Sequence, residues 1–113
     1  MEVRTACSPK DLKTYDTTRL REEFLIDNLF TPDEVKLVYS HVDRIITGSA
    51  VPVKAPLSLS SGAELHTGYF LDRRELGIIN IGGDGVVTVD GTPYALRNRD
   101  GLYVGMSAKE VRF

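Results

Sequence analysis

Short apolar stretches separated by turn residues make up most of the chain after residue 24. Between Glu75 and Phe113 the apolar runs have the length of strands, and Gly and Asp gather between them. Asp90-Gly91 is a two-residue hairpin signal, because both positions tolerate a positive φ. Here the pattern predicts turns at 82–85 and 97–101 and strands at 75–81, 86–89, 92–96, 102–104 and 110–113, with Pro93 at a sheet edge.

The middle of the chain also has a β-type pattern. Val35–Ile46 predicts one long strand, since Val, Ile and Tyr recur along it. Pro56–Ser60 alternates apolar and polar residues, which is typical of a half-buried strand, and Tyr69–Leu71 predicts the start of another strand. Short strands with turns at this spacing indicate a mainly β fold, an antiparallel sandwich or barrel.

The N-terminal residues have helix signals instead. Ser8-Pro9 is typical of a helix start, with Ser as the cap and Pro at the first helical position. Asp16–Thr18 precedes a second short helical stretch. Both pieces are too short to be stable alone. We therefore expect residues 1–30 to form an arm with short helices packing on the barrel, and residues 31–113 to form the β domain. Because Phe113 ends the chain within a strand-like stretch, we expect that domain to be truncated at its C-terminal end.

Composition limits the class of protein. The 113 residues are 42% hydrophobic and 27% charged with a net charge of −2, which fits one globular domain and argues against a nucleic-acid binder with a large positive field. The single cysteine, Cys7, excludes an internal disulfide, and no apolar run has the length of a signal peptide or a membrane helix. We expect a cytoplasmic protein with neither nucleic acid nor membrane as a partner.

Few residues have the spacing of a metal or nucleophile site. The two histidines, His41 and His66, stand far apart and in no ligand motif, and nothing near Cys7 predicts a reactive thiolate. The Gly82–Gly85 cluster lacks the Lys and the following helix of a phosphate loop, so a tight turn is the better interpretation. We expect no metal ligand and no cofactor-binding residue in this chain.

Two polar stretches are candidates for contact with a ligand. Arg73-Arg74 could bind a carboxylate through bidentate hydrogen bonds, or could lie in a solvated turn with a local ion pair. Ser40–Arg44 is more polar than a core strand, so it faces either a cavity or an oligomer contact. We therefore take His41, Arg44 and Arg74 as the candidate catalytic residues.

The last part of the chain resembles a cupin half-barrel. Glu75 and Gly82 have the spacing of the Glu ligand and the Gly in the family's first motif, and Gly85–Gly91 resembles the hairpin that follows. Gly68–Leu71 stands where the family has its His-x-His motif, and no His stands near Lys109, where the second motif has one. The resemblance therefore implies a cupin-like fold without its metal, because Glu75 alone would not hold zinc.

Within the cupins, the chain resembles the family of 4-deoxy-L-threo-5-hexosulose-uronate ketol-isomerases, in its N-terminal half. Essentially the whole chain carries this resemblance, through the stretches 16–25, 39–46, 69–77, 79–83 and 108–111.

The resemblance implies a two-cupin enzyme of bacterial pectin and uronate degradation. Such enzymes interconvert 5-dehydro-4-deoxy-D-glucuronate and 3-deoxy-D-glycero-2,5-hexodiulosonate. They carry zinc in the C-terminal cupin, bound by three His and a Glu, and assemble as hexamers. No position of this chain matches those ligands, so the resemblance implies a structural, inactive half whose partners are the missing C-terminal cupin domain and further copies of itself.

Two other interpretations stay open. The chain could be a free-standing, non-catalytic module that binds a sugar acid or oligomerises. A metal-independent isomerase in this chain alone would have to combine His41, His66 and Glu75 with the Arg residues, and nothing in the sequence places them together.

Overall fold

The structure, a computed structural model, describes all 113 residues as eight short strands with two α-helices and one 3₁₀ turn. Their bounds in chain order are β1 Glu2–Arg4, α1 Pro9–Leu12, α2 Thr17–Phe24, β2 Val35–Ser40, β3 Ile45–Ala50, η1 Ala63–Leu65, β4 Leu76–Ile79, β5 Gly85–Val89, β6 Thr92–Leu96, β7 Gly101–Val104 and β8 Val111–Arg112.

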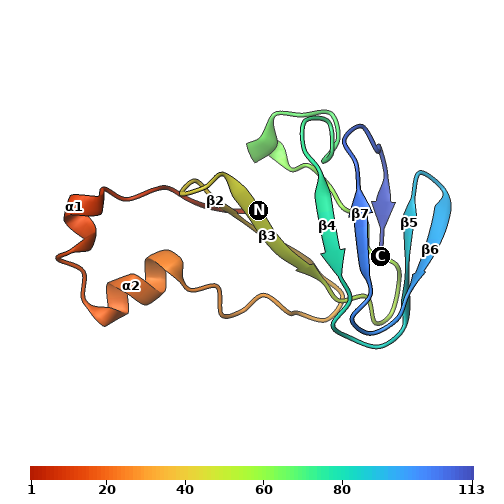
Figure 1. Cartoon of the computed structure of the whole chain (residues 1–113), viewed down its shortest axis with the longest axis horizontal. Helices are drawn as coiled ribbons and strands as arrows, with labels where there is room; N and C mark the ends of the chain where they lie inside the picture. Colours follow the sequence, from red (N-terminus) through yellow and green to blue (C-terminus); the bar gives the residue numbers. More distant parts are fainter.

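The strands form three small sheets, with strand orders β1-β2-β3, β4-β7 and β6-β5-β8. Every pairing is antiparallel except that of β1 with β2. Figure 1 shows the β4-β7 and β6-β5-β8 sheets close together, with the β2-β3 hairpin leading away from them toward the helices. The expected mainly β, antiparallel fold is confirmed, as a cupin-like domain requires.

The predicted elements of the C-terminal region are present. β4, β5, β6, β7 and β8 all lie within one residue of the predicted strands or inside them. Asp90 and Gly91 have φ values of 46° and 84°, as the hairpin turn between β5 and β6 needs. Pro93 lies in β6, an edge strand, where its missing N–H removes no ladder hydrogen bond from the interior of the sheet.

Three strand predictions in the middle of the chain need correction. Val35–Ile46 is not one strand but a hairpin, β2 and β3, whose turn contains Arg44 at a φ of 53°. Tyr69–Leu71 forms a turn, and its apolar character reflects burial rather than a strand. Pro56–Ser60 does not form a regular strand. Leu57 exchanges two backbone hydrogen bonds with Phe113, but the only strand-like pairing is one isolated β-bridge between Ser58 and Arg112.

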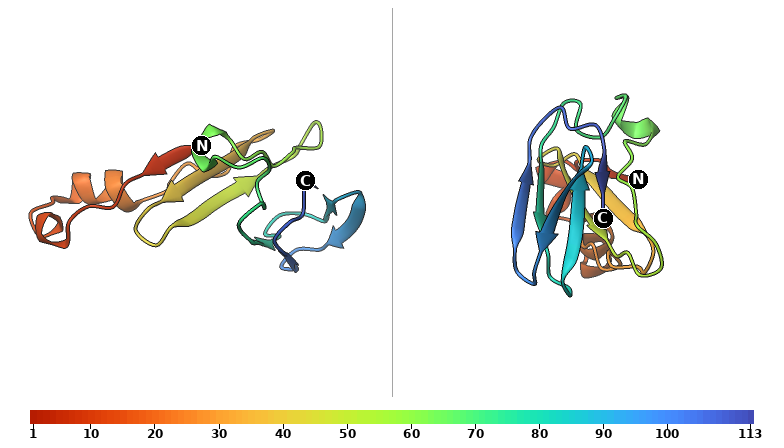
Figure 2. Two further views of the ribbon diagram at one scale, coloured as in Figure 1. Left: turned by 90° about the horizontal axis from the view of Figure 1, so that it is seen from above. Right: turned by 90° about the vertical axis from the view of Figure 1, so that its right-hand side faces the viewer.

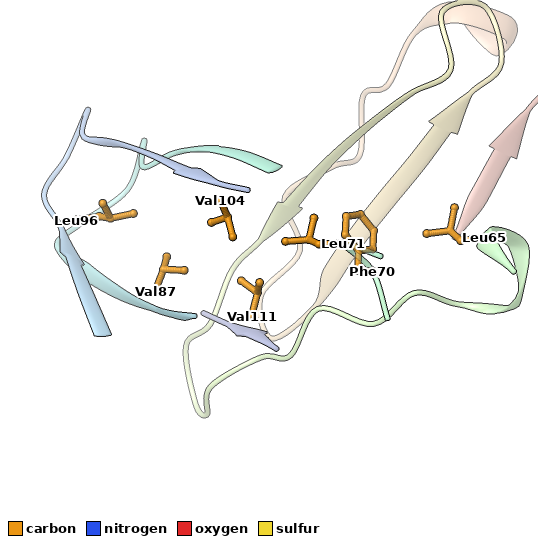
Figure 3. Close-up of a cluster of buried hydrophobic side chains, with 7 residues drawn as sticks. All are labelled: Leu65, Phe70, Leu71, Val87, Leu96, Val104 and Val111. Atoms are coloured by element: carbon orange, nitrogen blue, oxygen red, sulfur yellow. The ribbon is translucent and has the colours of Figure 1, made fainter. Parts of the chain in front are cut away.

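The hydrophobic core joins the sheets through a loop. Leu65, Phe70 and Leu71 come from the turn segment before β4, and Leu71 is the one fully buried side chain, with 0% of its surface exposed. Figure 3 shows these three side chains in line with four from the other strands: Val87, Leu96, Val104 and Val111. The core is small, because only 8 of 113 residues are buried.

The N-terminal segment contains both predicted helices, each with its predicted cap. The Ser8 side chain accepts a hydrogen bond from the N–H of Lys10, and the Asp16 side chain accepts one from Arg19. Neither helix has a buried residue, and both lie to one side of the sheets (Figure 1). Packing of the arm on the barrel is therefore not observed within this chain. The division of the chain at residue 30 stays a prediction.

The molecule is elongated for its size. Its radius of gyration is 15.8 Å, and its principal extents are 49 × 29 × 21 Å. A compact chain of this length has a radius of gyration of about 13 Å. Its accessible surface is 7923 Å². A compact protein of this mass exposes about 6,200 Å², so the excess is roughly 1,700 Å².

Gly48 in β3 gives the first testable prediction. A Cβ on Gly48 would lie 2.4 Å from a Leu37 methyl carbon and 2.6 Å from the Lys36 carbonyl oxygen, because Leu37 lies directly opposite in β2. Gly48→Ala should therefore lower the free energy of unfolding by about 1–3 kcal/mol, measured by denaturant titration. Gly77→Ala is the matched control: a Cβ there has no heavy atom within 4 Å, so stability should hardly change. Equal effects of the two substitutions would contradict the close approach of Leu37 to β3.

Candidate functional site

The β2-β3 turn holds two of the three candidate residues. His41 and Arg44 are both exposed in this turn. The His41 ring lies 4.6 Å from the Tyr39 ring between centroids, and its backbone N–H donates to the Arg4 carbonyl at 2.9 Å. Neither side chain forms a hydrogen bond or an ion pair within the chain. The polar character of Ser40–Arg44 is therefore that of an exposed turn within this chain.

Arg74, the third candidate, lies just before β4 and is half-buried. Its Nη1 donates to the Phe70 carbonyl oxygen at 3.1 Å, and its guanidinium carbon lies 5.8 Å from the centroid of the Phe70 ring. These contacts stabilise the buried loop that ends at Leu71. The remaining N–H groups of the guanidinium have no hydrogen-bond partner within the chain, so they can still meet a carboxylate.

The structure does not bring the three candidates together. Figure 1 shows the β2-β3 turn on the side of the helices, whereas the segment before β4 lies on the far side of the hairpin. No hydrogen bond or ion pair joins His41 or Arg44 to Arg74. Within this chain they do not form a catalytic group.

A polar pair that the sequence did not reveal lies beside Arg74. Tyr103 in β7 is directly opposite Gly77 in β4, and Glu75 stands two residues before Gly77 on the same face. A hydrogen bond to Glu75, together with partial loss of hydration and the charge of Glu75, raises the pKa of Tyr103 above its usual value. The Tyr103 side chain is 66% exposed, so Tyr103, Glu75 and Arg74 offer hydrogen-bonding groups to solvent or to a partner. Only the register of β4 with β7 could have predicted this pair.

The chain does not fit a metal. A structural or catalytic zinc takes about four ligands in tetrahedral geometry, most of them His, Cys, Asp or Glu side chains. No three such side chains cluster anywhere in the structure. His66 ends the 3₁₀ turn η1 in a left-handed conformation with a φ of 48°, His41 lies in the β2-β3 turn, and Cys7 is a half-buried thiol near α1.

A cavity of about 350 Å³ lies between the first sheet and residues 26–29. Three of its four charged side chains have partners: Arg4 Nε donates to Glu2 at 2.6 Å, and Lys36 Nζ donates to the Asn28 carbonyl at 3.2 Å, whereas Asp27 has no hydrogen bond or ion pair. The rest of its lining is mostly apolar, with Met1, Ile26 and Leu37 among the contacts. The cavity holds no acid–base pair.

The longest helix, α2, has eight residues, too few for any helix here to cross a membrane.

The effect of Glu75 on the pKa of Tyr103 gives the second prediction. Because Glu75 raises the pKa of the Tyr103 phenol, Glu75→Gln should move that pKa down toward its usual value of about 10. The folded state favours the neutral phenol, so this contribution to stability is present below pH 10 and is lost as the pH rises through the raised pKa. NMR titration of ring-labelled tyrosine, assigned with Tyr103→Phe, measures the pKa. Glu110→Gln is the control, and an unchanged Tyr103 pKa in Glu75→Gln would contradict the assignment.

The full length of the chain is similar in sequence to known proteins. No family model matches the chain. It is 66% identical over 113 residues to the 4-deoxy-L-threo-5-hexosulose-uronate ketol-isomerase of Lachnoclostridium phytofermentans, covering 100% of the chain and 41% of that protein. The proteins of the same name from Lachnospira eligens and Escherichia coli O45:K1 are 57% and 51% identical, again over 100% of the chain and 40% and 41% of their length. The chain spans about two-fifths of these curated relatives. Over its whole length it is therefore similar to one part of the 4-deoxy-L-threo-5-hexosulose-uronate ketol-isomerases.

Proposed function

We propose that this chain is the N-terminal, non-metal cupin domain of an aldose–ketose isomerase. In this proposal the complete protein converts 5-dehydro-4-deoxy-D-glucuronate to 3-deoxy-D-glycero-2,5-hexodiulosonate in the cytoplasm, as a step of pectin and uronate degradation. The observation that carries it is the similarity of the entire chain to part of the named ketol-isomerases, at 66% identity in one of them.

The proposed role of this domain is scaffolding rather than catalysis. An aldose–ketose shift moves a proton between adjacent carbons and needs a positioned base. His41 and Arg44 lie in the β2-β3 turn and Arg74 lies before β4, and no cluster of side chains in this chain fits the zinc expected in the complete enzyme. The small core and the roughly 1,700 Å² of excess surface support a domain that is completed by packing on the C-terminal cupin and on further copies.

A sugar-acid-binding or oligomerising module without catalysis is the second candidate. The separation of Arg74 from His41 and Arg44 favours it as much as it favours a scaffold. The two candidates differ in whether a metal-bearing domain belongs to the same protein.

Activity and metal content test the proposed function. We expect a protein that contains this chain and has the full length of its relatives to interconvert the two uronate-derived sugars and to retain zinc. Residues 1–113 alone should do neither. The measurements are a coupled isomerase assay and the metal content by plasma mass spectrometry. An inactive longer protein, or full activity in residues 1–113, would overturn the proposal.

Arg74 is the candidate with free N–H groups for the substrate carboxylate. In the longer protein, Arg74→Ala should lower kcat/KM about tenfold to hundredfold, the range for losing a hydrogen bond to a charged group. Arg73→Ala is the matched control, because Arg73 is exposed and only forms a 3.8 Å ion pair with the neighbouring Asp72. Thermal unfolding of both variants separates a binding effect from the loss of the Phe70 contact. An unchanged kcat/KM in Arg74→Ala would remove Arg74 from the site, while His41 and Arg44 stay predictions.

A further inference from the structure

Three Asp-Gly pairs in the turns of the β domain are chemically alike. In such a pair the Asp side chain can close a five-membered succinimide ring with the next backbone nitrogen, because Gly has no side chain to obstruct the approach. The chain contains no Asn-Gly pair, and its Asp-Gly pairs are Asp84-Gly85, Asp90-Gly91 and Asp100-Gly101. All three Asp residues are exposed. The dipeptide and its exposure therefore do not distinguish the three sites, whereas their hydrogen bonds do.

Two of the three carboxylates are held by backbone N–H groups. Asp90 Oδ1 accepts hydrogen bonds from the N–H groups of Lys109 at 2.9 Å and Glu110 at 2.8 Å. Asp100 Oδ2 accepts one from the Arg97 N–H at 2.8 Å. Hydrogen bonds to an ionised carboxylate are roughly twice as strong as those between neutral groups. Ring closure at Asp90 or Asp100 must break these bonds, because the carboxyl group has to turn toward the next backbone nitrogen.

Asp84 is the one Asp-Gly carboxylate that is not held. It forms no hydrogen bond or ion pair, and the contact of Asn80 Nδ2 with the Gly83 carbonyl oxygen, at 2.8 Å, ends one residue before it. A Cβ on Gly83 or Gly85 would meet no heavy atom within 4 Å, so no packed neighbour limits rotation on either side of Asp84. Figure 2 shows β5, which begins directly after Asp84, at the end of the molecule opposite the helices.

We propose that Asp84-Gly85 is a modification site, at which Asp84 converts to isoaspartate as the protein ages. The Gly85 nitrogen attacks Asp84 Cγ and forms a C–N bond, while the carboxyl hydroxyl and the amide proton leave as water. A second water adds to the main-chain carbonyl carbon of Asp84 and breaks its bond to the Gly85 nitrogen. One water leaves and one enters, so the step needs no oxidant or cofactor. The inference does not rest on the isomerase activity.

The modification changes the backbone where β5 begins. The main chain then runs through the Asp84 side chain and is longer by one carbon. Gly85 is paired with Leu96 of β6, whose side chain is buried in the core, and β5 is the central strand of its sheet. We therefore expect isomerised molecules to lose the pairing of Gly85 with Leu96 and to melt at a lower temperature.

Ageing of the purified protein tests the site. A protein that contains this chain and has the length of its relatives is incubated for several weeks at physiological temperature and pH. Isoaspartate is labelled by an isoaspartyl methyltransferase and located by electron-transfer fragmentation of tryptic peptides, of which Glu75–Arg97 contains both Asp84 and Asp90. We expect at least about tenfold more isoaspartate at Asp84 than at Asp90 or Asp100, the factor for breaking one hydrogen bond to a charged group. Similar amounts at the three sites, or none at Asp84, would overturn the proposal.

Unfolding and substitution separate the effect of the structure from that of the dipeptide. In concentrated urea, where the hydrogen bonds to Asp90 and Asp100 are lost, we expect the three sites to react at similar rates. Asp84→Glu keeps the charge but cannot close a five-membered ring, so labelling of the folded variant should fall to background and ageing should leave its melting temperature unchanged. A preference for Asp84 that persists in urea, or full labelling of Asp84→Glu, would overturn the proposal.

Discussion

Burial of the loop before β4 holds the sheets of this small protein together. Leu71 is completely buried, and its carbonyl oxygen accepts a hydrogen bond from the Ser107 N–H at 2.8 Å. The carbonyl oxygen of Phe70 accepts a hydrogen bond from Arg74 Nη1. A sheet of two short strands, such as β4-β7, is at best marginally stable by itself. The loop supplies the missing apolar side chains, so the β4-β7 and β6-β5-β8 sheets share one core.

The shortage of apolar core explains why the candidate functional residues have structural partners. Arg74 stabilises the buried loop, and the His41 ring stacks on Tyr39 of the same hairpin. Neither contact needs a substrate. The chain has a small core and is similar to about two-fifths of the length of the ketol-isomerases.

The arm follows from the same shortage of core. Its helices have good caps at Ser8 and Asp16, but caps satisfy only the first N–H groups of a helix and bury nothing. Arg4 Nη1 donates a hydrogen bond to the Leu25 carbonyl oxygen and so joins β1 to the segment after α2, while Leu20 and Phe24 stay partly exposed.

Local signals determined much of the secondary structure. The caps at Ser8 and Asp16, the Asp90-Gly91 turn and the edge position of Pro93 each depend on a few neighbouring residues, so they could be predicted from the sequence. The strand predictions failed where an apolar stretch is buried without forming one extended strand. Tyr69–Leu71 is apolar because the core buries it in a turn. Val35–Ile46 bends at Arg44, whose positive φ cannot be predicted from its residue type. The parallel pairing of β1, the Glu75–Tyr103 pair and the hydrogen bond from Arg4 to the Leu25 carbonyl oxygen join residues distant in sequence. Only the tertiary structure decided them, because strand register and loop closure bring those groups together.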